Sequence, residues 1–205
     1  MDGGNFAAAA RVDFEPWEKT IYMWDMMGRL GYEVVTPGDL EMLQGIDALK
    51  ELYARQPQIQ VVSANVQDKA GARIFPEYTV IQKGDVKVGV TGVISPSFYS
   101  FNRKRGFQKR DDFTFEDVRE ALTRVLPDLR EQSDVIVALL HVGPGDARRI
   151  VQDIDGMDVV IVGHNPGYMF NPDRVNNTLL IRPGARGQYV SVLSLTLDET
   201  TRAIV

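Results

Sequence analysis

Apolar runs that fit buried strands alternate with stretches that have helical periodicity along most of the chain. In the first part of the chain, predicted helices alternate with predicted strands, and β structure dominates the end. This order predicts an α/β layered domain with mixed sheets rather than a purely parallel, doubly wound sheet. The predicted helices cover residues 17–31, 46–56, 114–132 and 143–154. The predicted strands cover residues 32–36, 59–66, 134–141 and 157–164, a hairpin over 78–93 that turns at Gly84-Asp85, and a strand pair within 177–198.

Composition narrows the class of protein. The chain has 205 residues, of which 44% are hydrophobic and 25% charged, as expected for a single globular domain. A net charge of -5 argues against a dedicated nucleic-acid binder. The absence of cysteine excludes disulfides, thiolate metal sites and cysteine nucleophiles. No apolar run is long enough for a membrane span, and the first residues do not fit a signal peptide, so the compartment stays unknown.

Polar side chains follow three of the predicted strands. The strands end in "VVTPGDLE", "VIVALLHVG" and "VVIVGHNPG", and the last two contain the chain's two histidines, His141 and His164. Sites in layered α/β folds assemble at such strand ends. Each histidine can simply cap its strand, but the pair together with an acidic turn favours a metal or anion site. Imidazole and carboxylate ligands suit Zn, Mn or Fe.

These segments resemble those of 5'-nucleotidase-like metallophosphoesterases, a group of calcineurin-like phosphoesterases. The segment "GYEVVTPGDLEMLQG" resembles the family's strand followed by Gly-Asn-His-Glu, and "MDGGNF" resembles its Asp-Ala-Gly-Asp-Phe. The other strands follow in the family's order. The resemblance implies a four-layer α/β/β/α sandwich over residues 1–205. It also implies an active site in which two metal ions share a bridging Asp and activate water for phosphoester hydrolysis.

The resemblance also implies that one of the two metal sites is reduced and the other lost. The family's bridging Asp falls at Asn5 and its metal-binding Asn at Asp39, so the carboxylate and the amide have exchanged places. Its middle His is His141, and the first His of its last motif is His164. Pro166 replaces that motif's second His, and the Asp-x-His motif would lie before Met1. We therefore expect one divalent metal at Asp39, His141 and His164, with Asn5 as a weaker ligand. The alternative is a decayed site whose polar residues bond one another.

The catalytic His of the family falls at Leu40, whereas Glu41 matches the family Glu. A leucine cannot donate a proton, so an efficient 5'-nucleotidase is not expected. Two functions remain open. One is a phosphoester hydrolase with weak or altered activity toward a small phosphoester or nucleotide. The other is a non-catalytic relative that serves as a binding or structural domain of a larger protein.

The resemblance also predicts missing parts. The family's first strand lies inside a sheet, so we expect an upstream segment or a partner chain to complete that sheet. The family's C-terminal nucleotide-binding domain is also expected to be absent. Members of the family are mostly periplasmic or at the cell surface.

Two basic features are weaker candidates. Arg186, in the Gly-rich segment 182–189, is a minor candidate for substrate binding. The basic stretch 101–110 is interpreted as a solvated loop, with anion binding or partner docking as the alternative.

Overall fold

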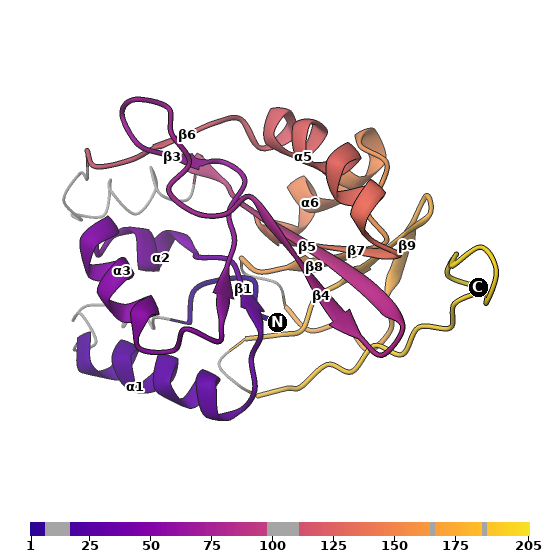
Figure 1. Cartoon of the computed structure of the whole chain (residues 1–205), viewed down its shortest axis with the longest axis horizontal. Helices are drawn as coiled ribbons and strands as arrows, with labels where there is room; N and C mark the ends of the chain where they lie inside the picture. The colour runs from indigo at the N-terminus through magenta and orange to yellow at the C-terminus, as the bar shows by residue number, and fades with distance from the viewer. Residues whose placement is uncertain (7–16, 98–110, 165–166, 186–187) are drawn as a thin grey trace.

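A mixed six-stranded sheet forms the centre of the computed structural model, which describes residues 1–6, 17–97, 111–164, 167–185 and 188–205 (Figure 1). The strand order is β4-β5-β7-β8-β10-β9. The strands are β4 (Tyr78–Lys83), β5 (Val86–Ile94), β7 (Val135–His141), β8 (Val159–Val162), β9 (Asp173–Val175) and β10 (Thr178–Ile181). The inner four strands are parallel, and both edge strands are antiparallel to their neighbours. The prediction of a mixed sheet is therefore confirmed.

Two helices cover one face of this sheet, α5 (Val118–Gln132) and α6 (Pro144–Asp153) (Figure 1). The Asp117 side chain caps α5 by accepting hydrogen bonds from the amides of Arg119 and Glu120. Leucines of α5, such as Leu122 and Leu129, are fully buried in the core formed with the sheet. This packing places α5 over β4, β5 and β7, and α6 over β8 and β9.

The opposite face packs against a second β layer. Its paired strands are β1 (Val34–Val35) and β2 (Gln60–Val61), which are parallel. Leucines of residues 190–205 pack into the same apolar cluster. Beyond this layer lie α1 (Trp17–Arg29), α2 (Asp39–Met42) and α3 (Ile46–Ala54), which enclose a separate core around Trp24. The layers therefore follow the predicted α/β/β/α order.

The N-terminal segment lies beside β1. Asp2 forms a parallel bridge with Val35, its amide donates to the Val34 carbonyl, and its carbonyl accepts from Thr36. Residues 1–6 therefore enter the second β layer next to the strand that leads into α2.

Two predicted elements differ clearly from the structure in extent. The strand expected over 59–66 is split into β2 and β3 (Val66–Gln67), because the amides of Ser63 and Ala64 donate to other segments. The helix expected from residue 114 begins at Val118, since β6 (Thr114–Phe115) pairs with β3.

The second strand expected within 177–198 is not formed by the described residues of that range. Among them only β10 is a strand, and the later part contributes a single bridge between Leu197 and Ile204. Leu193 and Leu195 nevertheless pack into the apolar cluster of the second layer. The alternation of apolar and polar residues therefore reflects packing on a sheet and not strand pairing.

Within the described ranges, no helix is both long enough and apolar enough to cross a bilayer.

Candidate functional site

The three polar strand ends meet at one edge of the molecule. β7 ends at His141, and β8, its parallel neighbour, is followed by Gly163 and His164. Asp39 is the first residue of α2, which follows β1. Ligand atoms of Asp39, His141 and His164 all lie within 4.8 Å of one another. The predicted convergence of these three residues is therefore present in the structure.

His141 is held in one orientation by the N-terminal segment. The ring is fully buried, and its Nδ1 lies 2.8 Å from the Gly3 carbonyl oxygen. A carbonyl can only accept, so Nδ1 carries a proton and donates. The opposite nitrogen, Nε2, lies 2.7 Å from Asp39 Oδ1. Two acceptors cannot face each other at that distance, so a proton or a cation is required between them.

His164 completes the cluster from the side that is accessible to solvent. Its Nδ1 lies 3.3 Å from His141 Nε2 and 3.4 Å from Asp39 Oδ1. Its side chain is 24% exposed, whereas the other two residues are essentially inaccessible. The cluster is therefore approached past His164.

The Asp39 carboxylate stays ionised although it is buried. Burial alone would raise the pKa of Asp39, but hydrogen bonds from His141, His164 and Asn5 lower it well below its ordinary value. A buried anion surrounded by imidazole nitrogens is an arrangement that also suits a divalent cation.

Asn5 lies beside the cluster. Its Nδ2 donates to Asp39 Oδ1 at 3.0 Å, and its Oδ1 accepts from the Leu40 amide at 3.0 Å. Both ends of the amide group are therefore engaged. Asn5 has a left-handed backbone with φ of 62°, a conformation that asparagine tolerates better than most residues.

Glu41 holds this asparagine in place. Its carboxylate is completely buried, and Oε2 accepts from the amides of Asn5 at 2.8 Å and Gly38 at 2.7 Å. One side chain of α2 thus ties the N-terminal segment to the turn before Asp39. The sequence placed Glu41 in the motif but did not indicate this connection, which joins residues 36 positions apart.

Glycines allow the backbones around the site to touch. A Cβ atom on Gly3 would lie 2.8 Å from Gly163 Cα, and one on Gly163 would lie 1.9 Å from the Gly3 oxygen. A Cβ atom on Gly4, which has φ of 93°, would meet the backbone of Gly38 and the His141 ring. These contacts bring the Gly3 carbonyl within reach of His141. No residue pattern in the sequence indicates these contacts.

The donor set fits a metal ion. With ligand distances of about 2.0–2.2 Å, tetrahedral ligand atoms lie roughly 3.3–3.6 Å apart, which matches both distances from His164 Nδ1. The remaining separation, from His141 Nε2 to Asp39 Oδ1, is shorter at 2.7 Å, so these two atoms must move slightly apart for a tetrahedral ion to fit between them. The bond from His141 Nδ1 to the Gly3 carbonyl is the kind of support that metal-binding histidines usually have.

Of the other predicted residues, Leu40 is described and is not part of the cluster. The Leu40 side chain packs against the core of α1, α2 and α3. Arg186, Pro166 and the basic stretch 101–110 lie outside the described residues.

Comparison with known proteins gives a consistent picture. No family model matches the chain. The chain is 25% identical to the trifunctional nucleotide phosphoesterase protein YfkN of Bacillus subtilis over 88% of its own length and 14% of that protein. It is 27% identical to a 2',3'-cyclic-nucleotide 2'-phosphodiesterase/3'-nucleotidase of Haemophilus influenzae, over 85% of the chain and 31% of that protein. The chain thus spans well under half the length of these relatives.

A solved structure shares the fold over the whole chain. The crystal structure of a 5'-nucleotidase precursor from Thermus thermophilus superimposes with a TM-score of 0.83 at 21% identity, covering 100% of this chain and 43% of that one. The similarity expected from the sequence is therefore confirmed, and the chain has the fold of a 5'-nucleotidase-like metallophosphoesterase domain.

Proposed function

We propose that this domain is a metal-dependent phosphoester hydrolase with one divalent ion held by Asp39, His141 and His164. The observation that carries the proposal is the convergence of these three ligand atoms within 4.8 Å at the strand ends. The relatives named as a nucleotide phosphoesterase and as a 2',3'-cyclic-nucleotide 2'-phosphodiesterase/3'-nucleotidase support phosphoester hydrolysis for this domain as well. Small phosphoesters or nucleotides are the proposed substrates.

Each residue has a distinct part in this proposal. A divalent cation, when bound, polarises a phosphoryl oxygen and acidifies water. Asp39 supplies the negative charge of the site, His141 is fixed by Gly3, and His164 stands at the accessible side. Asn5 restrains Asp39, and becomes a fourth ligand only if its amide leaves the Leu40 backbone. Zn, Mn and Fe all suit this ligand set.

The proposed activity is weak. Leu40 has no group that can donate a proton to a leaving oxygen, and the second metal site is proposed to be lost. A general acid contributes about 10²–10⁴-fold to rate, so its absence alone reduces turnover by a large factor.

A second candidate is a non-catalytic domain that binds a ligand or supports a larger protein. Two observations favour it: Leu40 lies at the position proposed for the catalytic group, and both ends of the Asn5 amide are engaged by protein. In this proposal, a partner chain or another segment completes the second β layer beside residues 1–6.

Turnover of p-nitrophenyl phosphate and bis(p-nitrophenyl) phosphate with Zn²⁺ or Mn²⁺ tests the hydrolase. We expect slow, metal-dependent release of p-nitrophenol that His141→Ala abolishes. The exposed carboxylate variant Asp155→Ala serves as the control and keeps the activity. Bound metal without turnover of either ester would instead favour the non-catalytic domain.

A further inference from the structure

Three aromatic side chains form an exposed cluster that begins four residues after His164. The rings of Tyr168 and Tyr189 stack with centroids 4.0 Å apart and planes at 17°. Phe170 meets Tyr168 edge-on, with centroids 4.8 Å apart. Phe170 is 88% exposed and Tyr189 is 50% exposed, so this cluster buries little of its own apolar surface. Such a surface is typical of a binding site.

The backbone holds this cluster in place before any ligand arrives. The Met169 amide donates to the Arg182 carbonyl at 3.1 Å, and Tyr168 forms an antiparallel bridge with Pro183. Gly184 has φ of 87°, and a Cβ atom there would lie 2.8 Å from the Tyr189 ring. Glycine therefore permits the close approach that brings the two tyrosine rings together.

The exit of β8 leads first to His164 of the proposed metal site and then to Tyr168 of the aromatic cluster. Tyr168 follows His164 by four residues. β10 is the parallel neighbour of β8, with Ile181 opposite Ile161. Arg182 comes directly after Ile181, and His164 comes three residues after Ile161. Because neighbouring strands lie about 4.8 Å apart, Arg182 lies near the exit of β8 toward His164.

Arg182 adds a positive charge next to the aromatic rings. Its Nη1 lies 3.7 Å from the position of a Cβ atom on Gly167, the residue that precedes Tyr168. Within the described part of the chain, its guanidinium makes neither an ion pair nor a hydrogen bond. A half-buried arginine without a carboxylate partner is well suited to bind a phosphate.

We propose that Tyr168, Phe170 and Tyr189 form a stacking subsite for the planar ring of an aromatic or nucleoside phosphoester, with Arg182 binding its phosphate. This inference rests on the proposed function, because it assigns the substrate class of the same centre. Flat, exposed rings bind planar ligands by stacking, and an adjacent cation selects those that carry a phosphate. An aliphatic peptide would use neither the parallel ring faces nor the guanidinium.

Binding of two sugar phosphates, one with a planar nucleobase and one without, tests this subsite. Adenosine 5'-monophosphate and ribose 5-phosphate are titrated into the full chain by calorimetry, with one equivalent of Zn²⁺ present. We expect the nucleotide to bind about 10-fold more tightly, and Phe170→Ala or Tyr189→Ala to remove most of this difference. Arg182→Gln is expected to lower the affinity for both probes by a similar factor.

Val192→Ala is the matched control, since Val192 lies near Tyr189 in the chain, is 85% exposed and carries no aromatic ring. It is expected to leave both affinities unchanged. Equal affinity for the two probes, no measurable nucleotide binding, or unchanged affinity in Phe170→Ala overturns the subsite. Circular dichroism confirms that each exposed variant remains folded.

The outcome separates this inference from the proposed function. A ring preference without hydrolysis of either probe supports the subsite and contradicts the hydrolase. Hydrolysis of both probes at equal rates, without a ring preference in binding, supports the hydrolase and overturns the subsite.

Discussion

At the scale of single residues, the site depends on a buried carboxylate that does not belong to the metal cluster. Glu41 accepts two backbone hydrogen bonds, and these fix Asn5 and Gly38 relative to each other. Because its side chain has no access to solvent, removing it leaves two amides without their partner. Glu41 is therefore a positioning residue for the whole cluster.

We predict that Glu41→Ala lowers the free energy of unfolding by about 2–5 kcal/mol, because charged hydrogen bonds and buried donors are lost together. Glu41→Gln keeps an acceptor and is expected to cost less. Urea denaturation measures both changes. The control is Glu51→Ala on the exposed face of α3, where an effect near zero is expected. Equal stability of the Glu41 and Glu51 variants would contradict this role.

The glycine contact between Gly3 and Gly163 gives a second prediction. Gly163→Ala places a methyl group against the Gly3 carbonyl, which must then move away from His141. We expect a loss of about 1–3 kcal/mol in stability and a 10–100-fold loss in metal affinity.

Gly145→Ala is the control for this change, since nothing lies within 4 Å of its added carbon and the residue is in a helix. Alanine there is expected to stabilise the protein by about 0.5–1 kcal/mol. If both alanine variants behaved alike in denaturation and metal binding, the glycine contact would have no role.

The sequence predicted the three residues that cluster but not the groups that support them. His141, His164 and Asp39 could be predicted because each follows an apolar strand, and parallel strands bring such residues to one edge. The Gly3 carbonyl and the Glu41 carboxylate could not be predicted this way. Their partners are distant in sequence, and backbone amides and carbonyls leave no residue-type signal.

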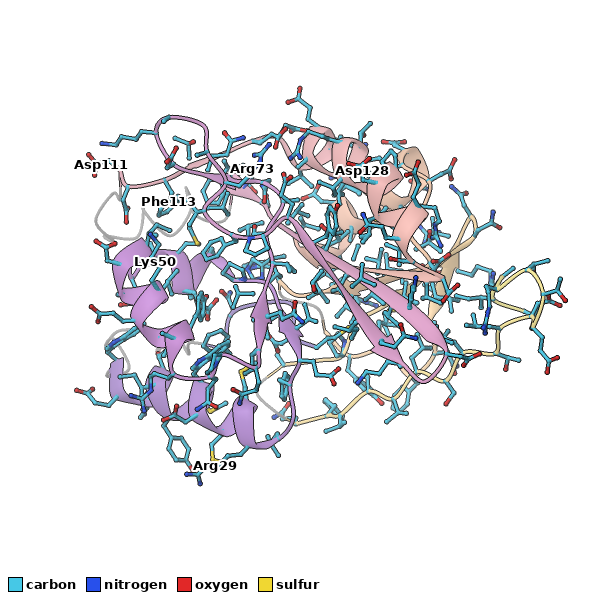
Figure 2. All side chains as sticks on the ribbon, viewed as in Figure 1. Arg29, Lys50, Arg73, Asp111, Phe113 and Asp128 are labelled. Carbon is cyan, nitrogen blue, oxygen red and sulfur yellow. The ribbon has the colours of Figure 1, made fainter. Side chains whose placement is uncertain are left out.

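At the scale of elements, α5 is anchored by ion pairs at its start. Glu116 contacts Arg124 of α5 at 2.8 Å and Arg73, labelled in Figure 2, at 2.7 Å. Arg124 also donates to the Ala64 carbonyl. Burial opposes ionisation of Glu116, but the hydrogen bond from Arg124 and the charges of both arginines lower its pKa. This network links α5 to the segment after β2.

The lowered pKa of Glu116 sets the sign of a pH effect. The ionised form is favoured in the folded state, so its contribution is complete above the ordinary pKa of 4.5 and is lost as pH falls through the folded value. We predict that Glu116→Gln lowers stability by about 0.5–1.5 kcal/mol at pH 7. Below about pH 4 the difference from the unmodified chain should shrink. Urea denaturation at both pH values measures it, and a difference that grows in acid would contradict this account.

Element types were predicted better than element ends. Helical periodicity located α1, α3, α5 and α6, because each buries one apolar face. The prediction that the tail within 177–198 contains a second strand is wrong for the residues that the structure describes. The leucines of this tail do alternate, but strand pairing depends on a neighbouring backbone, and a single sequence does not contain that information.

At the scale of the whole molecule, the four layers bring three separate strand ends together. The N-terminal segment, β1 with α2, and the exits of β7 and β8 each contribute one part of the cluster. The centre is therefore a product of the tertiary fold, and any metal that binds it should stabilise the folded state by mass action. We predict a higher melting temperature in saturating Zn²⁺, with no rise in Asp39→Ala.

Direct measurement of bound metal is the sharpest test of the central claim. The chain, purified without chelator, is titrated with Zn²⁺ or Mn²⁺ by calorimetry, and bound metal is counted after dialysis. The account predicts a stoichiometry near one that is lost in Asp39→Ala and retained in Asp155→Ala. A stoichiometry near zero, or binding unchanged in Asp39→Ala, would contradict it.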